Sequence, residues 1–319
     1  MLDLLKNKPQ MVLEAQKARF KPGLAIQVLI FIAVFFVSQI AASLPMIIGT
    51  VVKLFTDISD GRADLTSAAG SQEYISQLTT SNWMNIMMLF CTAIAAVIPI
   101  IYCKFIEGRS LFSMGFVRKK AVSNYASGLL IGGLMFGSAV LLCCLTGTLK
   151  FDGIVLGNSL GIVIVFFFGF LIQGMSEEII LRGYFMVSVA VKKSIMTAIL
   201  ANSIMFSLVH IFNNGVSVLP LLNLTLFGIF ASVYMLRTEN IWGIGAIHSM
   251  WNFVQGNIFG IPVSGMKIKA SVLSFSQQGN SLINGGDFGL EGGLAVTVVL
   301  VVAIALTVLL KRKQRTTIM

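Results

Sequence analysis

Two adjacent carboxylates and an arginine interrupt one of the most apolar stretches of the chain. Glu177 and Glu178 follow the run 162–172, which carries no charge, and Arg182 comes four residues after Glu178. On a helix, Glu178 and Arg182 can pair on one face, whereas Glu177 lies about 100° further round. One acid is then neutralised and the other is available. A carboxylate held in a pocket of low dielectric can take a proton from water, so the pattern predicts hydrolytic chemistry with a general base.

Both histidines of the protein also lie in apolar stretches. Phe206 precedes His210 by four residues, and His248 precedes Asn252 by four, so each pair shares a helical face. Counted from the polar ends of their segments, Glu177 and His210 lie roughly 22–26 Å along their helices, but His248 and Asn252 only roughly 12–18 Å. The second pair therefore requires a tilted helix, or a connection that dips into the membrane.

Imidazole and carboxamide N–H groups can hold a developing oxyanion, and imidazoles can also ligate a divalent metal. Each feature alone has a structural explanation, because a histidine or asparagine in a membrane helix usually makes an interhelical hydrogen bond. The coincidence of two acids, both histidines and an asparagine in three helices favours chemistry. The sequence has no His-Glu-x-x-His zinc motif, no Gly-x-Ser-x-Gly serine nucleophile and no pair of membrane aspartates.

The elements that must position these groups are transmembrane helices. Of 319 residues, 56% are hydrophobic and only 11% are charged, whereas soluble domains carry about 25% charged residues. The sequence thus predicts an all-α, polytopic membrane protein with about eight transmembrane helices. We expect these helices at about 24–52, 83–102, 125–149, 159–191, 194–212, 216–236, 241–261 and 294–310. Residues 53–82 are expected to form an external loop, and 263–292 a further loop.

Charge predicts the orientation of these helices. With eight spans and both termini inside, 18 of the 23 lysine and arginine residues fall on the cytoplasmic side, or 17 when Arg182, which lies at membrane depth, is discounted. The positive-inside rule favours this orientation. The expected parts are a cytoplasmic N-terminal segment (1–22), a membrane domain (23–310) with a protease core at about 159–261, and a basic cytoplasmic tail (311–319). The basic residues flank apolar segments, so the expected partner is the lipid bilayer and not nucleic acid.

Three motifs in this order resemble those of one family: Glu177-Glu178-x-x-x-Arg182, Phe206-x-x-x-His210 and His248-x-x-x-Asn252. They are similar to the motifs of the CPBP family of CAAX prenyl proteases and bacteriocin-processing or self-immunity proteins, also called Abi. The resemblance covers about residues 174–255. It implies an intramembrane endopeptidase in which Glu177 activates water and His210 helps to hold it. His248 and Asn252 would stabilise the oxyanion, and Glu178, Arg182 and Phe206 would support the site.

The sequence leaves several questions open. A divalent metal such as Zn²⁺, held by Glu177, His210 and His248, and a metal-free water activated by glutamate both suit these residues; no other cofactor site is expected. The expected substrate is a peptide or protein presented near a bacterial plasma membrane, such as a bacteriocin precursor or a signal peptide. The alternatives are a non-catalytic scaffold or immunity protein, and a proton-coupled transporter, for which the chain shows no inverted repeat.

Overall fold

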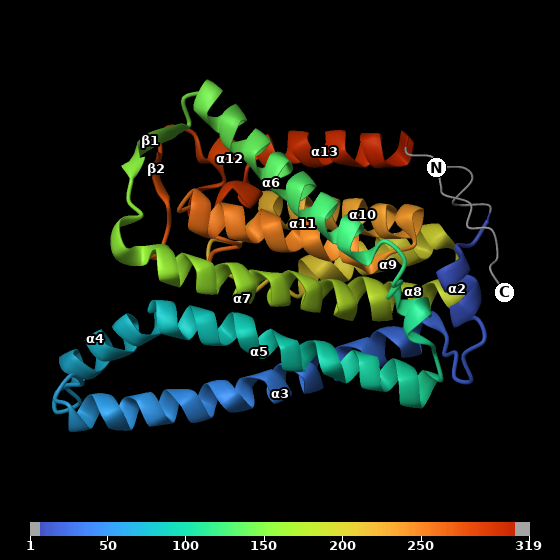
Figure 1. Ribbon diagram of the computed structural model, residues 1–319, viewed down its shortest axis with the longest axis horizontal. Coiled ribbons are helices and arrows are strands. Elements are labelled where there is room, and N and C mark those ends of the chain that lie inside the picture. The colour runs from blue at the N-terminus through green and yellow to red at the C-terminus, as the bar shows by residue number, and fades with distance from the viewer. Residues whose placement is uncertain (1–6, 310–319) are drawn as a thin grey trace.

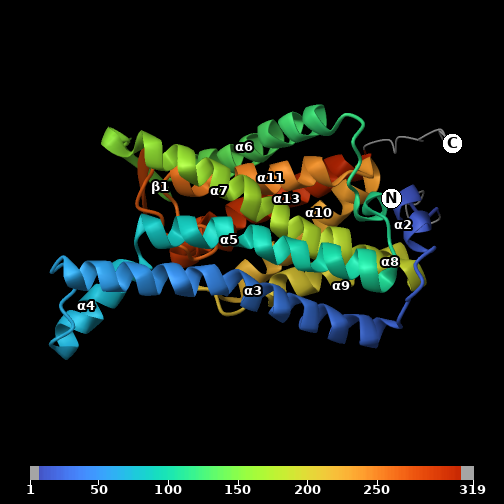
Figure 2. The same cartoon turned by 60° about the horizontal axis from the view of Figure 1, so that its bottom comes forward.

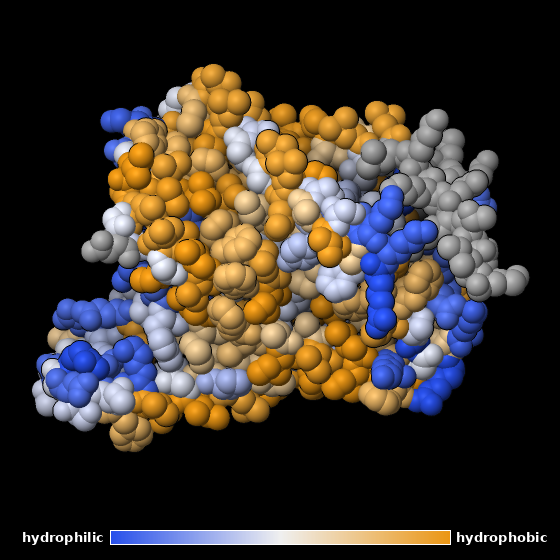
Figure 3. Space-filling view, viewed as in Figure 1, coloured by the Kyte–Doolittle hydropathy of each residue, from blue (hydrophilic) through white to orange (hydrophobic). Residues whose placement is uncertain are grey.

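The computed structural model describes residues 7–309 as an elongated bundle of helices that run along its long axis (Figure 1). Five of these helices are long and apolar enough to cross a membrane. The all-α, polytopic membrane fold predicted from composition is confirmed. A space-filling view shows hydrophobic side chains in a broad belt, with hydrophilic ones gathered towards the two ends (Figure 3). Such a belt is the surface that a bilayer requires, because lipid offers no partners to polar groups.

The predicted spans correspond to the main helices. These are α3 (Leu24–Ser59), α5 (Asn82–Ile101), α6 (Ala121–Leu145), α7 (Leu160–Glu178) with α8 (Val187–Lys192), α9 (Ile195–Leu208), α10 (Val218–Thr238), α11 (Ile241–Phe253) and α13 (Leu294–Leu309). Helices α9 and α13 are apolar but shorter than a full span. The side chain of Ser194 accepts a hydrogen bond from the backbone N–H of Thr197 and so fixes the start of α9.

The segments between the spans are more ordered than the sequence indicates. Helix α3 continues to Ser59 and is followed by α4 (Ala68–Thr79), so the predicted external loop is largely helical. Strands β1 (Leu149–Ile154) and β2 (Leu273–Gln277) form an antiparallel pair in which Phe151 faces Phe275. Figures 1 and 2 place α4 at the opposite end of the molecule from α2 (Gln10–Ala15). Short elements complete the described chain: η2 (Leu111–Met114), η3 (Gly157–Ser159), α12 (Ser281–Asn284), η6 (Gly286–Phe288) and η7 (Leu290–Gly292).

Three long helices end in π-helical turns. These are η1 (Tyr102–Glu107) after α5, η4 (Ile179–Met186) between α7 and α8, and η5 (Val254–Ile258) after α11. Turn η4 begins directly after Glu178 and contains Arg182. A π-helical turn widens the helix by one residue and is frequent at functional sites.

The connection between α10 and α11 dips into the molecule. The N–H of Ile241 donates to the carbonyl of Gly115 at 3.0 Å, and the indole N–H of Trp242 donates to the carbonyl of Val117 at 3.1 Å. Met114, the residue before Gly115, packs against Gly183, where an added Cβ would lie 3.1 Å from the carbonyl oxygen of Met114. The start of α11 is therefore level with Gly183, about 13 Å before the end of α8. These contacts favour the dipping connection as the explanation for the shallow position of His248.

Candidate active site

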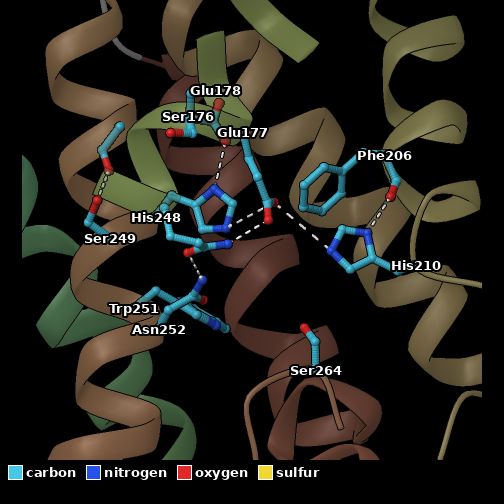
Figure 4. A network of polar contacts seen from close by, with 12 residues as sticks. Ser176, Glu177, Glu178, Phe206, His210, His248, Ser249, Trp251, Asn252 and Ser264 are labelled. Atoms are coloured by element: carbon cyan, nitrogen blue, oxygen red, sulfur yellow. Dashed lines mark hydrogen bonds and ion pairs between the residues drawn. The ribbon is translucent and has the colours of Figure 1, made fainter. Parts of the chain in front are cut away.

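A close approach of α7 to α11 brings the acids to the second histidine. A Cβ added at Gly174 would lie 2.5 Å from the backbone nitrogen of Ser249, so only glycine permits this contact. Glu177 and Glu178 lie one turn further along α7, beside His248 on α11. Figure 4 shows these side chains converging from two helices, with His210 approaching from the turn that follows a third helix, α9.

Glu178 is the centre of a buried ionic contact. Its Oε1 lies 2.9 Å from Nη1 of Arg182 and 2.8 Å from Nδ1 of His248, and both Glu178 and Arg182 are fully buried. The predicted pairing of Glu178 with Arg182 is therefore present. Because the carboxylate accepts from His248 Nδ1, that nitrogen carries the proton, and His248 turns its Nε2 towards Glu177.

Glu177 uses its two carboxylate oxygens differently. Oε1 accepts a hydrogen bond of 2.5 Å from the side-chain amide of Gln173, one helical turn earlier. Oε2 is buried and has no hydrogen-bond partner. It lies 3.7 Å from Nε2 of His248 and 4.0 Å from Nε2 of His210. Polar groups separated by more than 3.5 Å leave room for a bridging water molecule.

His210 lies in the turn after α9 and is oriented by the backbone of that helix. Its Nδ1 lies 2.7 Å from the carbonyl oxygen of Phe206, which can only accept, so Nδ1 carries the proton and Nε2 faces Glu177. Neutral His210 and neutral His248 thus both present a lone pair to the space beside Glu177 Oε2. A water molecule placed there would donate its protons to these acceptors. His248 could donate from Nε2 only as an imidazolium.

Aromatic rings close the site on one side. The guanidinium of Arg182 lies 4.4 Å from the ring of Phe206, within the range of a cation–π contact. Phe227 on α10 packs against His248 at 5.0 Å and against Phe206 at 5.6 Å. These rings exclude water from the Glu178–Arg182 pair and hold both imidazoles in position.

Asn252 reaches Glu177 through an intermediate residue. Its Nδ2 donates to Oε1 of Gln173 at 2.9 Å, and Gln173 in turn donates to Glu177. The asparagine therefore orients Gln173, which orients the carboxylate. Asn252 also lines the cavity described below, so its carboxamide is accessible to a bound molecule.

Glu177, His210, His248 and Asn252 line a cavity of about 970 Å³. The segments 263–267 and 287–291 form part of its wall, and hydrogen bonds of Glu291 hold them in place. One carboxylate oxygen of Glu291 accepts from the indole N–H of Trp251 at 3.0 Å, and the other accepts from the N–H and hydroxyl of Ser264 at 2.8 and 2.7 Å. The cavity falls within the range of pockets that bind small molecules or peptide segments.

The three candidate metal ligands, Glu177, His210 and His248, do not form a metal site as placed. Ligands around tetrahedral Zn²⁺, with bonds of about 2.0–2.1 Å, lie about 3.3 Å apart, whereas the carboxylate oxygen lies 3.7 and 4.0 Å from the imidazole nitrogens. Across residues 7–309, no group of three His, Cys, Asp or Glu side chains is arranged to hold a metal ion.

The structure brings all seven residues of the three motifs together. Sequence reasoning missed three further residues of the site: Gln173, Phe227 and Glu291. Gln173 carried a usable signal, because it is a polar residue four positions before Glu177 in an apolar helix. Phe227 and Glu291 carried none, because one is an aromatic in an apolar span and the other lies in a glycine-rich loop.

Comparison with known proteins bears on this arrangement. The model of the family described as type II CAAX prenyl endopeptidase Rce1-like matches residues 159–254. The matched segment extends from the residue before α7 to the start of η5, and contains all three motifs. No curated protein and no solved structure matches the chain. The resemblance to CAAX proteases is thereby confirmed over residues 159–254, the segment of this membrane protein that matches the model of the Rce1-like type II CAAX prenyl endopeptidases.

Proposed function

We propose that this protein is an intramembrane endopeptidase in which Glu177 activates a water molecule to hydrolyse a peptide bond. One observation carries the proposal: the unpartnered Oε2 of Glu177 faces Nε2 of both His210 and His248 inside a cavity of about 970 Å³. The match to an endopeptidase family supports it.

The reaction follows from the positions of the proton donors and acceptors. Glu177 Oε2 takes one proton from a water molecule held against His210 Nε2, and the resulting hydroxide attacks the carbonyl carbon of the substrate. His248, as imidazolium, and the carboxamide of Asn252 donate to the oxyanion. The C–N bond then breaks, and the leaving amine takes the proton from Glu177. A positioned base of this kind contributes typically about 10²–10⁴-fold to a rate.

The charges near the site support an imidazolium at His248. Glu177 and Glu178 carry two negative charges, and Arg182 carries a single positive charge that already contacts Glu178. A proton on His248, which lies between the two carboxylates, would balance the remaining charge. Hydrogen bonds to charged groups contribute about 1.5–3 kcal/mol, so this arrangement also stabilises the site.

The proposed substrate is a peptide or protein presented at a bacterial plasma membrane, with bacteriocin maturation, signal-peptide maturation or self-immunity as the biological setting. Purified protein in detergent is incubated with a peptide library whose products are identified by mass spectrometry. We expect cleavage by wild type and its loss in both Glu177→Ala and His210→Ala, with each variant folded and monodisperse.

Three results would contradict the proposal. Cleavage that survives both substitutions would place the activity at another site. Absence of cleavage by wild type, together with a Glu177→Ala variant that still supports the function in cells, would favour the non-catalytic scaffold. Substrate flux in proteoliposomes without cleavage would favour the proton-coupled transporter.

A further inference from the structure

The cavity around Glu177 is polar towards one end of the molecule. Away from the motif residues, its wall includes Thr80, Asn85, Asn213, Asn214, Lys267 and Asp287. Thr80 and Asn85 lie between α4 and the first turn of α5, and the other four belong to the loops after α9 and α11. This is the end that carries α4, β1 and β2 (Figure 1). Side chains of this kind suit contact with water and with a peptide backbone.

The cavity is closed towards the opposite end. Among residues 7–309, no lining residue comes from 7–34, from 102–120 or from 182–205. Ile180 and Leu181, both buried, stand one turn beyond Glu177, and the fully buried Arg182 stacks on Phe206 behind them. Further on, Arg109 fills the space with hydrogen bonds to the carbonyls of Gly183 and Tyr184. A chain approaching from this end meets packed side chains.

The distribution of charge assigns the two ends to the two sides of a membrane. Of the lysine and arginine residues in 7–309, the end with the cavity mouth holds five: Lys53, Arg62, Lys150, Lys267 and Lys269. The opposite end holds α2, the loop 104–120 and the Lys192-Lys193 pair. Since cytoplasmic loops carry the excess of basic residues, the cavity mouth faces away from the cytoplasm.

We infer that the Glu177 site is reached from the non-cytoplasmic face, and that its substrate is a short extended polypeptide segment supplied on that face. The inference rests on the proposed function for the cleavage but not for the access. A volume of about 970 Å³ admits a short segment and not a folded domain. Chain termini presented from the cytoplasm would meet the closed end.

Thiol labelling in cells tests the access. Cys144 is the exposed cysteine among residues 7–309, and Cys91, Cys103 and Cys143 are buried, so Cys144→Ser gives the background. In that background, Glu177→Cys replaces a side chain that is 26% exposed to the cavity. Ser176→Cys is the matched control, because Ser176 is next to Glu177 in the chain and its side chain is buried. Asn214→Cys reports the cavity mouth, and Lys119→Cys reports the exposed basic loop.

A small charged methanethiosulfonate reagent that cannot cross the membrane is added to intact cells and, separately, to inverted vesicles. We expect Glu177→Cys and Asn214→Cys to react in intact cells and to lose that reaction in inverted vesicles. Lys119→Cys should show the opposite pattern, and Ser176→Cys should react in neither. Reaction of Glu177→Cys in inverted vesicles together with Lys119→Cys would overturn the inference.

Cleavage of a membrane-impermeant fluorogenic peptide separates this inference from the proposed function. We expect Glu177-dependent cleavage in detergent and in spheroplasts, but not in sealed inverted vesicles. Cleavage in detergent and in inverted vesicles alone would overturn the access and leave the endopeptidase. Labelling of Glu177→Cys in intact cells without cleavage in detergent would overturn the endopeptidase and leave the access.

Discussion

Two buried pairs of acid and arginine differ in how completely their hydrogen bonds are made. One is Glu178–Arg182, beside Glu177. The other is Glu107–Arg109, whose ion pair of 2.9 Å is also buried. The loop 104–120 supplies Arg109, and only 4% of Arg109 is exposed.

The Glu107–Arg109 pair is saturated. Arg109 donates to Ser113, Ser188 and the carbonyl of Gly183, and both carboxylate oxygens of Glu107 lie 3.0 Å from the hydroxyl of Ser188. No side-chain polar atom of either residue lacks a partner. Burial of charge is tolerated when each donor and acceptor is matched, so this cluster has a structural role.

The cluster around Glu177 is not saturated. Oε2 of Glu177, Oε2 of Glu178, and Nε and Nη2 of Arg182 are buried without hydrogen-bond partners. Unmatched buried polar atoms cost free energy and therefore call for a reason. The cavity supplies one, because a bound water molecule or substrate can provide the missing partners of Glu177. The contrast teaches that burial of charge does not identify a site, whereas incomplete hydrogen bonding next to a cavity does.

The largest expected effect separates the two clusters by one chemical change. Glu177→Gln should lower kcat/KM by about 10²–10⁴-fold, because the amide cannot accept the proton, while the unfolding temperature stays near that of wild type. Glu107→Gln should leave kcat/KM per folded molecule unchanged. Peptide cleavage and thermal unfolding in detergent, measured on both variants, check this. Equal losses of activity would erase the distinction.

Removing each arginine compares the stability of the two clusters. Arg109→Met should destabilise the protein by about 3–5 kcal/mol, because Glu107 is left buried and unpaired. Arg182→Met should cost less, because two of the guanidinium nitrogens have no partner to lose and His248 remains bound to Glu178. Chemical unfolding monitored by tryptophan fluorescence gives both values. A larger loss for Arg182→Met would contradict the assignment of the saturated cluster as the structural one.

A smaller effect is expected one turn before the catalytic acid. Gln173→Ala removes the hydrogen bond to Glu177 Oε1 and the acceptor for Asn252, worth about 1–1.5 kcal/mol. We expect kcat to fall roughly tenfold, with KM little changed, because the loss acts on the orientation of the base. A change confined to KM would argue that Gln173 contacts substrate instead.

The smallest expected effect is that of a chelator. Because Glu177, His210 and His248 lie too far apart to share a tetrahedral metal, EDTA or 1,10-phenanthroline should leave cleavage unchanged. Activity lost on chelation and restored by Zn²⁺, but not by Mg²⁺, would show that the three donors close on a metal. Measurement of bound metal in the purified protein gives an independent readout.

The sequence predicted the helical class and the motif residues because both depend on local patterns. Apolar runs fix the spans, and the spacing of four pairs Glu178 with Arg182. From the sequence, the dip between α10 and α11 was only one of two alternatives, because the contact that makes it is with Gly115, more than a hundred residues earlier in the chain. The saturated environment of Arg109 was hidden for the same reason: its partners Gly183 and Ser188 are about 75 residues away.

Helix α7, the π-helical turn η4 and helix α8 form one long helix. Turn η4 allows the parts before and after it to pack against different neighbours. The first part, α7, is oriented by the contact of Gly174 with α11, and the carbonyl of Gly183 within η4 is held by Arg109. An unbroken α-helix would tie these orientations together at 100° per residue. The extra residue acts as a joint, so substitutions in α8 can accumulate without rotating Glu177 away from its histidines. Deletion of a single residue between 179 and 186 would remove that freedom and force the two halves back into one register.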